Sequence, residues 1–218
     1  MSTVVIVGGH GKVALLAARA LSGQGRSVRS TIRDEAQGAD VEAAGAVPWT
    51  LDLEAADAGD VAEVLRGADA VVFSAGAGGK GGPERTRAVD LEGARKAIAA
   101  AGQAGVRRFV MVSAIGVDRP LPDDTADGWR AYVESKRDAD ALLRDSGLDF
   151  TIIRPGRLTD GPATDAVRIG RELDGGEVSR ADVAAVIAAV VGDDSTVGAQ
   201  FDLVGGDDAI SDALASLR

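Results

Sequence analysis

A glycine-rich turn between two apolar segments constrains the fold of this chain most strongly. Residues 4–7 are a continuous run of apolar, β-branched residues, which is typical of a strand buried on both faces. The run ends at the Gly-Gly-His-Gly turn of residues 8–11, and apolar residues at helical spacing follow from Val13 to Leu21. The order of strand, glycine turn and helix predicts the first βα unit of a parallel α/β sheet.

The spacing of the glycines predicts that this turn binds a phosphate. Gly9-x-Gly11-x-x-Ala14 fits the dinucleotide fingerprint, and Gly8 with Gly11 fits a second spacing that ends at the same alanine. Glycines let the backbone approach a phosphate, and a helix that begins near Lys12 adds free N–H groups and a positive dipole end. The alternative is a plain βα turn rich in glycine. Because a strand and a helix flank the motif, we expect a dinucleotide here, in contact with Gly8, Gly9, His10, Gly11, Lys12 and Val13.

The end of the second predicted strand bears on the type of cofactor. This strand covers residues 27–33 and brings Arg33 to its end just before Asp34. An acidic residue at this point accepts a hydrogen bond from the ribose 2′-hydroxyl of NAD, whereas an arginine can hold the 2′-phosphate of NADP. Because Arg33 comes before Asp34 at the strand end, the sequence favours NADP(H) as the cofactor, with NAD(H) possible. The alternative is that Arg33 is solvated and Asp34 binds the ribose.

Strands and helices alternate along the rest of the chain. The pattern predicts a Rossmann-type, doubly wound parallel sheet flanked by helices, in a single domain over residues 1–218. Pro48 lies in the third strand and cannot donate to a sheet, so that strand should be an edge, as in the order 3-2-1-4-5-6. Asp60 is expected to cap the next helix, and Ser179-x-x-Asp182 predicts a capping box. The later strands are expected at residues 46–51, 70–74, 109–113, 150–154 and 200–204.

A second group of residues predicts the chemistry. Tyr132, the sole tyrosine, precedes Lys136 by four residues, so the two side chains share one face of a helix. A nearby ammonium favours phenolate and should lower the pKa of the tyrosine, which suits proton transfer. Ser113 ends the fifth predicted strand, at the sheet edge where open α/β sheets bind ligands. The alternative is a surface tyrosine, a solvated lysine and a serine that merely ends a strand.

Composition limits the possible partners. The formal net charge is −10, which repels nucleic acid and anionic membranes, so the expected partner is a small-molecule substrate. The chain contains no cysteine and one histidine, which excludes a thiolate nucleophile and a metal site built on several histidines. No apolar run is long enough to span a membrane, and we expect a cytoplasmic protein. The few aromatic residues favour a monomer over a dimer.

The ordered set of motifs resembles the short-chain dehydrogenases/reductases, specifically their atypical subgroup of small NAD(P)-binding oxidoreductases related to the NAD-dependent epimerase/dehydratase family. The resemblance covers essentially the whole chain. It rests on GGHGKVA (8–14), IRD (32–34), LDL (51–53), VVFSAG (71–76), RRFVMVSAIG (107–116), YVESK (132–136), DFTIIRPG (149–156), VSRADVAAVIAAVV (178–191) and QFDLVGG (200–206).

The resemblance implies a role for each matching residue. Ser113 would orient a carbonyl or hydroxyl, Tyr132 would be the general acid/base, and Lys136 would bind the nicotinamide ribose and tune the tyrosine. The remaining cofactor contacts would be Asp52 and Leu53 beside the adenine, Ser74, Ala75 and Gly76 along the cofactor, and Pro155 near the nicotinamide.

The chain also departs from the family. His10 stands where the family often has a small or hydroxyl residue, and the segment after residue 156 leaves only a small C-terminal substrate-binding part. Residues 156–178 and 118–131 are expected to form the walls of the substrate pocket. Three hypotheses remain: an NADP-dependent reductase of a small carbonyl, quinone or flavin-like acceptor, an epimerase or dehydratase, and a catalytically silent NADP-binding regulator.

Overall fold

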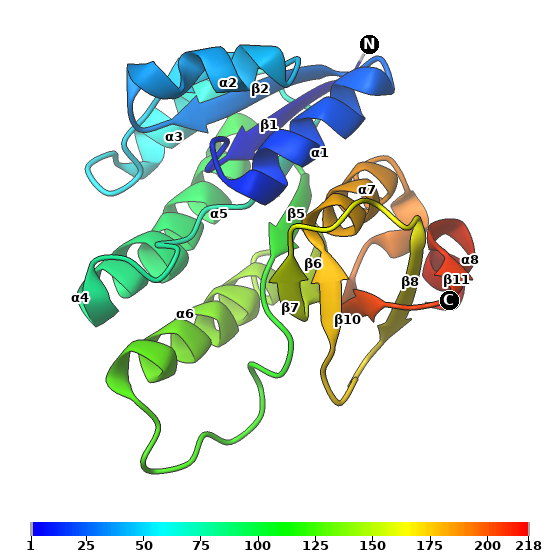
Figure 1. Ribbon diagram of the computed structural model, residues 1–218. Coiled ribbons are helices and arrows are strands. Elements are labelled where there is room, and N and C mark those ends of the chain that lie inside the picture. The colour runs from blue at the N-terminus through cyan, green and yellow to red at the C-terminus, as the bar shows by residue number, and fades with distance from the viewer. Residues whose placement is uncertain (1, 218) are drawn as a thin grey trace.

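The computed structural model describes residues 2–217, and a nine-stranded, mostly parallel sheet forms its centre (Figure 1). The strand order is β11-β8-β10-β6-β5-β4-β1-β2-β3, so the predicted order 3-2-1-4-5-6 is confirmed for the first six strands. The strand that contains Pro48 lies at the edge, as predicted. The strands of this sheet are β1 (Thr3–Val7), β2 (Ser27–Ile32), β3 (Val47–Thr50), β4 (Ala70–Phe73), β5 (Arg108–Val112), β6 (Asp149–Pro155), β8 (Ala166–Gly170), β10 (Ala199–Gly205) and β11 (Asp208–Ala209).

Helices cover both faces of the sheet, each over its own apolar core. On one face, α1, α2, α7 and α8 pack against residues such as Val4, Ile153 and Phe201. On the other face, α3, α5 and α6 pack against Val5, Phe109 and their neighbours. The helices are α1 (Lys12–Gly23), α2 (Gly38–Ala43), α3 (Ala58–Leu65), α4 (Gly82–Thr86), α5 (Gly93–Ala104), α6 (Asp127–Arg144), α7 (Arg180–Val190) and α8 (Ile210–Ala215), with short 3₁₀ segments η1 (Glu35–Gln37) and η3 (Asp194–Thr196) and a π-helical segment η2 (Arg87–Glu92).

The segment after β6 holds strands that the sequence analysis did not predict. β7 (Arg157–Thr159) and β9 (Glu177–Ser179) pair in parallel as a small second sheet, while β8 joins the main sheet antiparallel to β10. This part of the chain gathers at one end of the sheet (Figure 1). β7 and β9 have three residues each, too few for a residue pattern to stand out, and β8 is placed by its pairing with β10 and β11.

Two helix caps test the expectations about helix starts. Ser179 caps α7, because its hydroxyl accepts a hydrogen bond from the Asp182 amide at 2.9 Å, but only this half of the predicted capping box forms. The Asp182 carboxylate instead accepts from the amides of Thr164 and Asp165. The cap predicted for α3 was wrong by three residues. Asp57 is the capping residue and accepts from the amide of Asp60 at 2.9 Å, while the Asp60 carboxylate accepts from the Asp57 amide at 3.0 Å. Asp60 is therefore the third residue of the helix in a capping box, and Asp57 is its N-cap.

Among residues 2–217, no helix combines the length and the apolar character that crossing a bilayer requires.

Candidate cofactor and reaction site

The glycines of the first turn meet different physical demands. Gly8 has φ of +84°, and a Cβ there would lie 2.5 Å from Ala75 Cα. A Cβ at Gly9 would lie 2.4 Å from Ser30 Cβ. Protein packing alone therefore requires both glycines. At Gly11 the nearest atom to an added Cβ is 3.5 Å away, so protein packing does not require a glycine there and leaves space beside it.

The space beside Gly11 opens into a cavity that suits a phosphate. Gly11 caps α1, and among residues 2–217 no side chain accepts a hydrogen bond at the start of this helix. Free N–H groups at a helix start, with an uncrowded glycine before them, form the cradle that a pyrophosphate requires. The cavity has a volume of about 270 Å³ and lies where β1, β2 and β4 end.

Nine of the predicted cofactor-binding residues line this cavity: Gly8, His10, Gly11, Arg33, Asp52, Leu53, Ser74, Ala75 and Gly76. Its other lining residues were not predicted: Thr31, Ile32, Gln37, Leu51, Glu54, Ala77, Lys80, Arg85 and Val89. Most of them are neighbours of predicted positions on the same strand ends. Lys80 and Arg85 come from the segment after β4, where glycine-rich sequence gave no signal for a basic side chain.

The other predicted cofactor-binding residues lie outside the cavity. Lys12 Nζ contacts Asp160 Oδ2 at 2.7 Å, and the Val13 side chain is buried in the core. Gly9 packs against β2, and Pro155 ends β6, where its carbonyl accepts from the Ile115 amide at 3.0 Å. Lys136 lies farther along, in the reaction centre described below.

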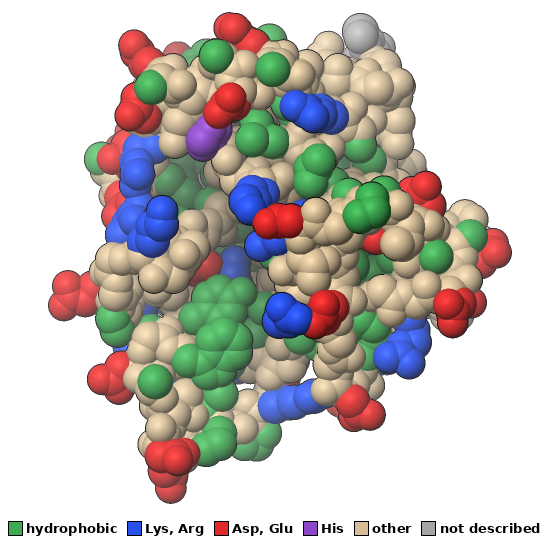
Figure 2. All heavy atoms as spheres, viewed as in Figure 1, with side chains coloured by type: hydrophobic (Ala, Val, Ile, Leu, Met, Phe, Trp, Pro, Cys, Tyr) green, Lys and Arg blue, Asp and Glu red, His purple; other side chains and the backbone are tan. Residues whose placement is uncertain are grey.

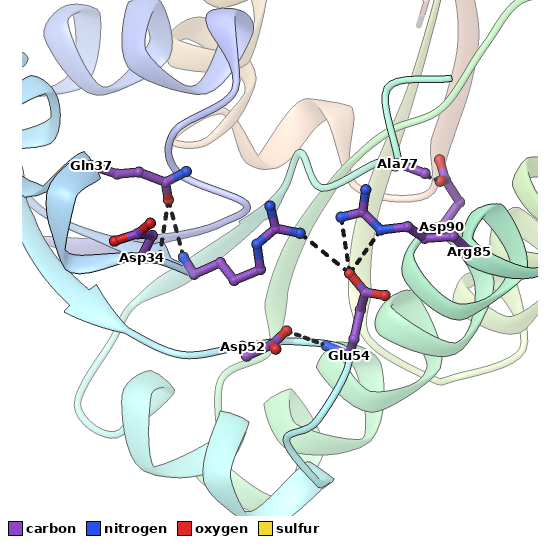
Figure 3. Close-up of polar contacts among 8 residues, drawn as sticks. Asp34, Gln37, Asp52, Glu54, Ala77, Arg85 and Asp90 are labelled. Atoms are coloured by element: carbon purple, nitrogen blue, oxygen red, sulfur yellow. Dashed lines mark hydrogen bonds and ion pairs between the residues drawn. The ribbon is translucent and has the colours of Figure 1, made fainter. Parts of the chain in front are cut away.

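Charged side chains gather where β2 and β3 end (Figure 3). Glu54 Oε1 accepts from Arg85 Nε and Nη2, both at 3.0 Å, and Arg33 Nη1 lies 3.5 Å from the same oxygen. Two guanidinium groups thus share one carboxylate oxygen, and Lys80 lines the same cavity. Asp52 does not add to this cluster, because its carboxylate accepts from the Glu54 amide at 3.0 Å.

Arg33 and Asp34 follow each other in sequence but have different surroundings. Arg33 lines the cavity, whereas Asp34 does not. The Asp34 carboxylate caps η1 and accepts from the Ala36 amide at 2.9 Å. Gln37 Oε1 in turn accepts from the Arg33 amide at 3.2 Å, which fixes the backbone at the strand end (Figure 3). The arginine is therefore the side chain that can reach a ligand.

The predicted group of Ser113, Tyr132 and Lys136 lies beyond the cavity, where β5 meets α6. Ser113 directly follows β5, and the Lys136 ammonium donates to the carbonyl of Val112 at 3.3 Å. This contact brings the lysine next to the serine. Tyr132 lies one turn before Lys136 on α6 and stacks on Trp129 with ring centroids 5.3 Å apart. Hydrophobic side chains over α6 border the hollow at the centre of this face, with Lys and Arg side chains at its other side (Figure 2).

Asp90 is a member of this centre that sequence reasoning missed. Lys136 Nζ lies 3.1 Å from Asp90 Oδ1, and both side chains are buried. Asp90 Oδ2 accepts from the Ala77 amide at 2.9 Å, so this carboxylate joins the lysine to the glycine-rich segment after β4. Asp90 lies in the π-helical η2, and such segments often occur at functional sites.

Asp140 is a second carboxylate that sequence reasoning missed. It follows Tyr132 and Lys136 at the same four-residue spacing on α6 and is completely buried. Ser113 Oγ donates to Asp140 Oδ2 at 2.9 Å, and Arg154 Nε donates to the same oxygen at 2.8 Å. Arg154 then contacts Asp118 Oδ2 at 2.6 Å. The i, i+8 spacing was a usable signal for Asp140, whereas Arg154 arrives from β6 through the fold.

The pKa of Tyr132 departs from the sequence prediction. Burial of the phenol raises this pKa above the ordinary value of 10.0. The Lys136 ammonium lowers it, as predicted, but Asp90 and Asp140 raise it and add to the effect of burial. Burial lowers the pKa of Lys136, but Asp90, Tyr132 and Asp140 together outweigh it, so this pKa is raised. The tyrosine is therefore held as the neutral phenol, a hydrogen-bond and proton donor.

Part of the expected walls of a substrate pocket lines a different cavity. Asp118, Arg119 and Pro120, with Arg171 and Glu172, line a cavity of about 710 Å³ beside β6 and β10. The rest of the expected walls, residues 121–131, 156–170 and 173–178, does not line this cavity, and neither do Ser113, Tyr132 and Lys136.

The fold and the cavity at the glycine turn define an NAD(P)-binding Rossmann-type protein. Residues 8–194 match the model of the NAD(P)H-binding family, and the chain belongs to that family. One solved structure from Lactococcus lactis, described as the oxidoreductase ylbE, is 30% identical over 99% of this chain and 96% of its own, with a TM-score of 0.85.

Three comparisons are the most informative. The Bacillus subtilis (strain 168) protein named "Uncharacterized sugar epimerase YhfK" is 41% identical over 191 residues, which cover 88% of each chain. A solved structure from Bacillus halodurans, described as an NAD-dependent epimerase/dehydratase, is 34% identical over 100% of both chains with a TM-score of 0.92. ChuY, an anaerobillin reductase from Escherichia coli O157:H7, is 26% identical with a TM-score of 0.76, over 95% of this chain and 98% of its own.

Proposed function

We propose that this protein is an NADP(H)-dependent oxidoreductase of the short-chain dehydrogenase/reductase type that reduces a small carbonyl, quinone or flavin-like acceptor. The observation that carries the proposal is geometric: Tyr132 lies one turn before Lys136 on α6, and the Lys136 ammonium forms a buried ion pair with Asp90 at 3.1 Å. A reduction needs a group that still holds its proton when the acceptor oxygen gains charge. Tyr132, held as the neutral phenol, meets that need at neutral pH.

Each residue of the centre has a part in this reaction. Bound NADPH supplies the hydride. Tyr132 donates its phenolic proton to the oxygen that becomes negative, and Lys136, fixed by Asp90, places a positive charge next to the phenol and stabilises the phenolate left behind. Ser113 positions the acceptor beside the tyrosine.

The hydrogen bond of Ser113 narrows the class of acceptor. Because its hydroxyl hydrogen is directed to Asp140, Ser113 presents lone pairs to a ligand. It therefore accepts a hydrogen bond from an N–H or O–H group. Flavin-like and hydroxylated acceptors carry such groups, whereas simple aldehydes do not. ChuY is named a reductase, which supports reduction of an acceptor as the direction of the reaction.

The surroundings of Arg33 support NADP(H) over NAD(H). Arg33 lines the cavity and shares the Glu54 carboxylate with Arg85, which leaves positive charge for a 2′-phosphate. Asp34, the acid that would bind the ribose of NAD, caps η1 instead.

An epimerase function is the second candidate, and the name of the Bacillus subtilis relative favours it. An epimerase returns the hydride to its substrate, so it consumes no NADPH over a full cycle. A silent regulator would bind cofactor without turnover, and the intact Ser113, Tyr132 and Lys136 argue against it.

A screen of NADPH oxidation against aldehydes, quinones and flavins tests the proposal. We expect steady consumption of NADPH with at least one quinone or flavin, and slower consumption with NADH. Tight binding of NADPH without oxidation by any acceptor would contradict the reductase and leave the epimerase or the regulator.

A further inference from the structure

The larger cavity lies on a polar part of the sheet. Phe150 and Arg154 of β6, with Gln200 and Asp202 of β10, line it. These residues alternate along their strands with core residues such as Phe201, which faces α7 on the opposite side. The cavity volume of about 710 Å³ is in the usual range for sites of small molecules.

Three arginines around this cavity make no hydrogen bond or ion pair with a carboxylate among the described residues, although Asp118 interacts electrostatically with Arg144, and Asp202 with Arg119. Arg144 Nη1 donates to the neutral Gln200 Oε1 at 2.6 Å, and Arg119 donates to the carbonyl of Leu173. Arg171 is exposed and makes no hydrogen bond or ion pair with residues 2–217. Exposed arginines without a partner also occur elsewhere among residues 2–217, Arg168 for example, and what sets Arg119, Arg144 and Arg171 apart is that they line one cavity.

The acidic residues of the cavity neutralise this charge only in part. Asp118 is already paired with Arg154 at 2.6 Å. Asp202 is buried and its Oδ2 accepts from the Leu173 amide at 3.0 Å, while burial raises the pKa of its carboxyl. Glu172 is the remaining acid, at the exposed rim. Arg119, Arg144 and Arg171 therefore keep an excess of positive charge.

We propose that this cavity is a second binding site, separate from the cofactor cavity, for a small molecule with two or more carboxylate or phosphate groups. Guanidinium groups bind such anions in pairs of parallel hydrogen bonds. Phe150, Pro120 and Val197 supply apolar surface for the body of the ligand.

Arg154 connects this cavity to the reaction centre. Arg154 lines the cavity and donates to Asp140, which accepts from Ser113. An anion that draws Arg154 toward the cavity would weaken the bond between Arg154 and Asp140, so occupancy should also change the turnover that depends on Ser113.

Titration calorimetry with citrate, with inorganic phosphate and with acetate, at matched ionic strength, tests the site. Each titration is run with and without excess NADP⁺. The variants are Arg171→Gln and Arg144→Gln, and the matched control is Arg168→Gln. Arg168 is also exposed and without a partner among residues 2–217, but it lies on β8 outside the cavity.

We expect citrate or phosphate to bind more tightly than acetate, with or without NADP⁺. Arg171→Gln and Arg144→Gln should each weaken that binding by about tenfold or more, because each removes a charge-assisted contact. Arg168→Gln should leave it within about twofold, as expected for screened surface charge. Preference for citrate over phosphate would identify a carboxylate ligand, and the reverse a phosphate ligand.

Three results would overturn the site: no binding of either anion, equal weakening by the Arg168→Gln control, or loss of binding when NADP⁺ is present, which would place the anion in the cofactor cavity. Failure of NADP⁺ itself to bind would contradict the proposed function, while the arginine variants and their Arg168→Gln control would still test this site.

Discussion

Ser113 donates its hydroxyl hydrogen to Asp140 Oδ2 over 2.9 Å, and Asp140 is buried away from solvent. The carboxylate thereby fixes the orientation of the serine, and Arg154 holds the carboxylate from the other side at 2.8 Å. Asp140 thus controls which way Ser113 presents its lone pairs, although it does not itself line either cavity.

We therefore expect Asp140→Asn and Ser113→Ala to affect turnover through the same step. Each should lower turnover by about 10- to 100-fold, the worth of one charge-assisted hydrogen bond, with cofactor affinity nearly unchanged. Steady-state kinetics of the two single variants and the double variant measures this. If Asp140 acts through Ser113, the double variant should be no slower than Ser113→Ala. Additive losses would show that Asp140 has a separate role.

The titration of Tyr132 can be measured directly, because it is the sole tyrosine. Asp90 raises its pKa and Lys136 lowers it, so the two substitutions should act in opposite directions. Asp90→Asn should move the titration to lower pH, and Lys136→Met should move it to higher pH. The ultraviolet absorbance of phenolate, followed against pH without cofactor, measures both.

The matched control for this titration is Asp182→Asn, which alters a buried aspartate on α7. It should leave the midpoint unchanged. Shifts in the same direction for Asp90→Asn and Lys136→Met would mean that conformational change, and not charge, sets the pKa of the phenol.

Much of this site follows from local sequence, because its residues lie on single elements. The glycine turn was predicted from residues that adjoin one another, and Tyr132 with Lys136 from the spacing of one helix. The same four-residue spacing places Asp140 on that face of α6, so this residue could also have been predicted from the helix alone. The predicted strand order followed from the alternation of elements and the position of Pro48.

The parts that could not be predicted come from segments that meet only in the folded chain. Asp90 in η2 and Arg154 in β6 are far from α6 in sequence, and no local pattern marks them as its partners. Burial of the phenol, which no local pattern reveals, is the main reason why the pKa of Tyr132 is raised, whereas the sequence predicted a lowered one. The Asp90 and Asp140 carboxylates add to this rise.

Arg33→Ala should remove the preference for NADP(H). Losing a charge-assisted contact to the 2′-phosphate costs on the order of 1.5–3 kcal/mol, while NAD(H) affinity should barely change. Fluorescence titration with both cofactors measures the ratio. Arg95→Ala is the control, because Arg33 and Arg95 have the same exposed side-chain fraction of 54% and Arg95 pairs with Glu92 on the helical surface. A preference that survives Arg33→Ala would exclude Arg33 as the residue that recognises the phosphate.

Gly11→Val should weaken NADP(H) and NAD(H) together. The fold accommodates a Cβ at Gly11, so the variant should unfold at about the temperature of the unchanged protein. Its side chain would occupy the space that a pyrophosphate needs. Gly23→Ala adds a side chain to the same helix where no atom lies within 4 Å, and it should leave affinity unchanged. A folded Gly11→Val protein with normal affinity would refute this position of the phosphate.

Tyr132→Phe tests the chemistry itself. The substitution keeps the ring and its stacking on Trp129 but removes the proton that the phenol would donate. Cofactor affinity should barely change, while turnover of a carbonyl acceptor should fall by about 10²–10⁴, the usual contribution of general acid catalysis.

With the tyrosine present, its raised pKa should keep that turnover constant from neutral pH well into the alkaline range, and turnover should decline only as the phenol ionises. In the variant this alkaline decline should disappear. Turnover of Tyr132→Phe with a carbonyl and with a flavin should be compared. A flavin can take its proton from water after hydride transfer, so its turnover need not depend on Tyr132. Undiminished turnover of the carbonyl by Tyr132→Phe would mean that the protein supplies no proton, and Tyr132 would then lose its place as the acid.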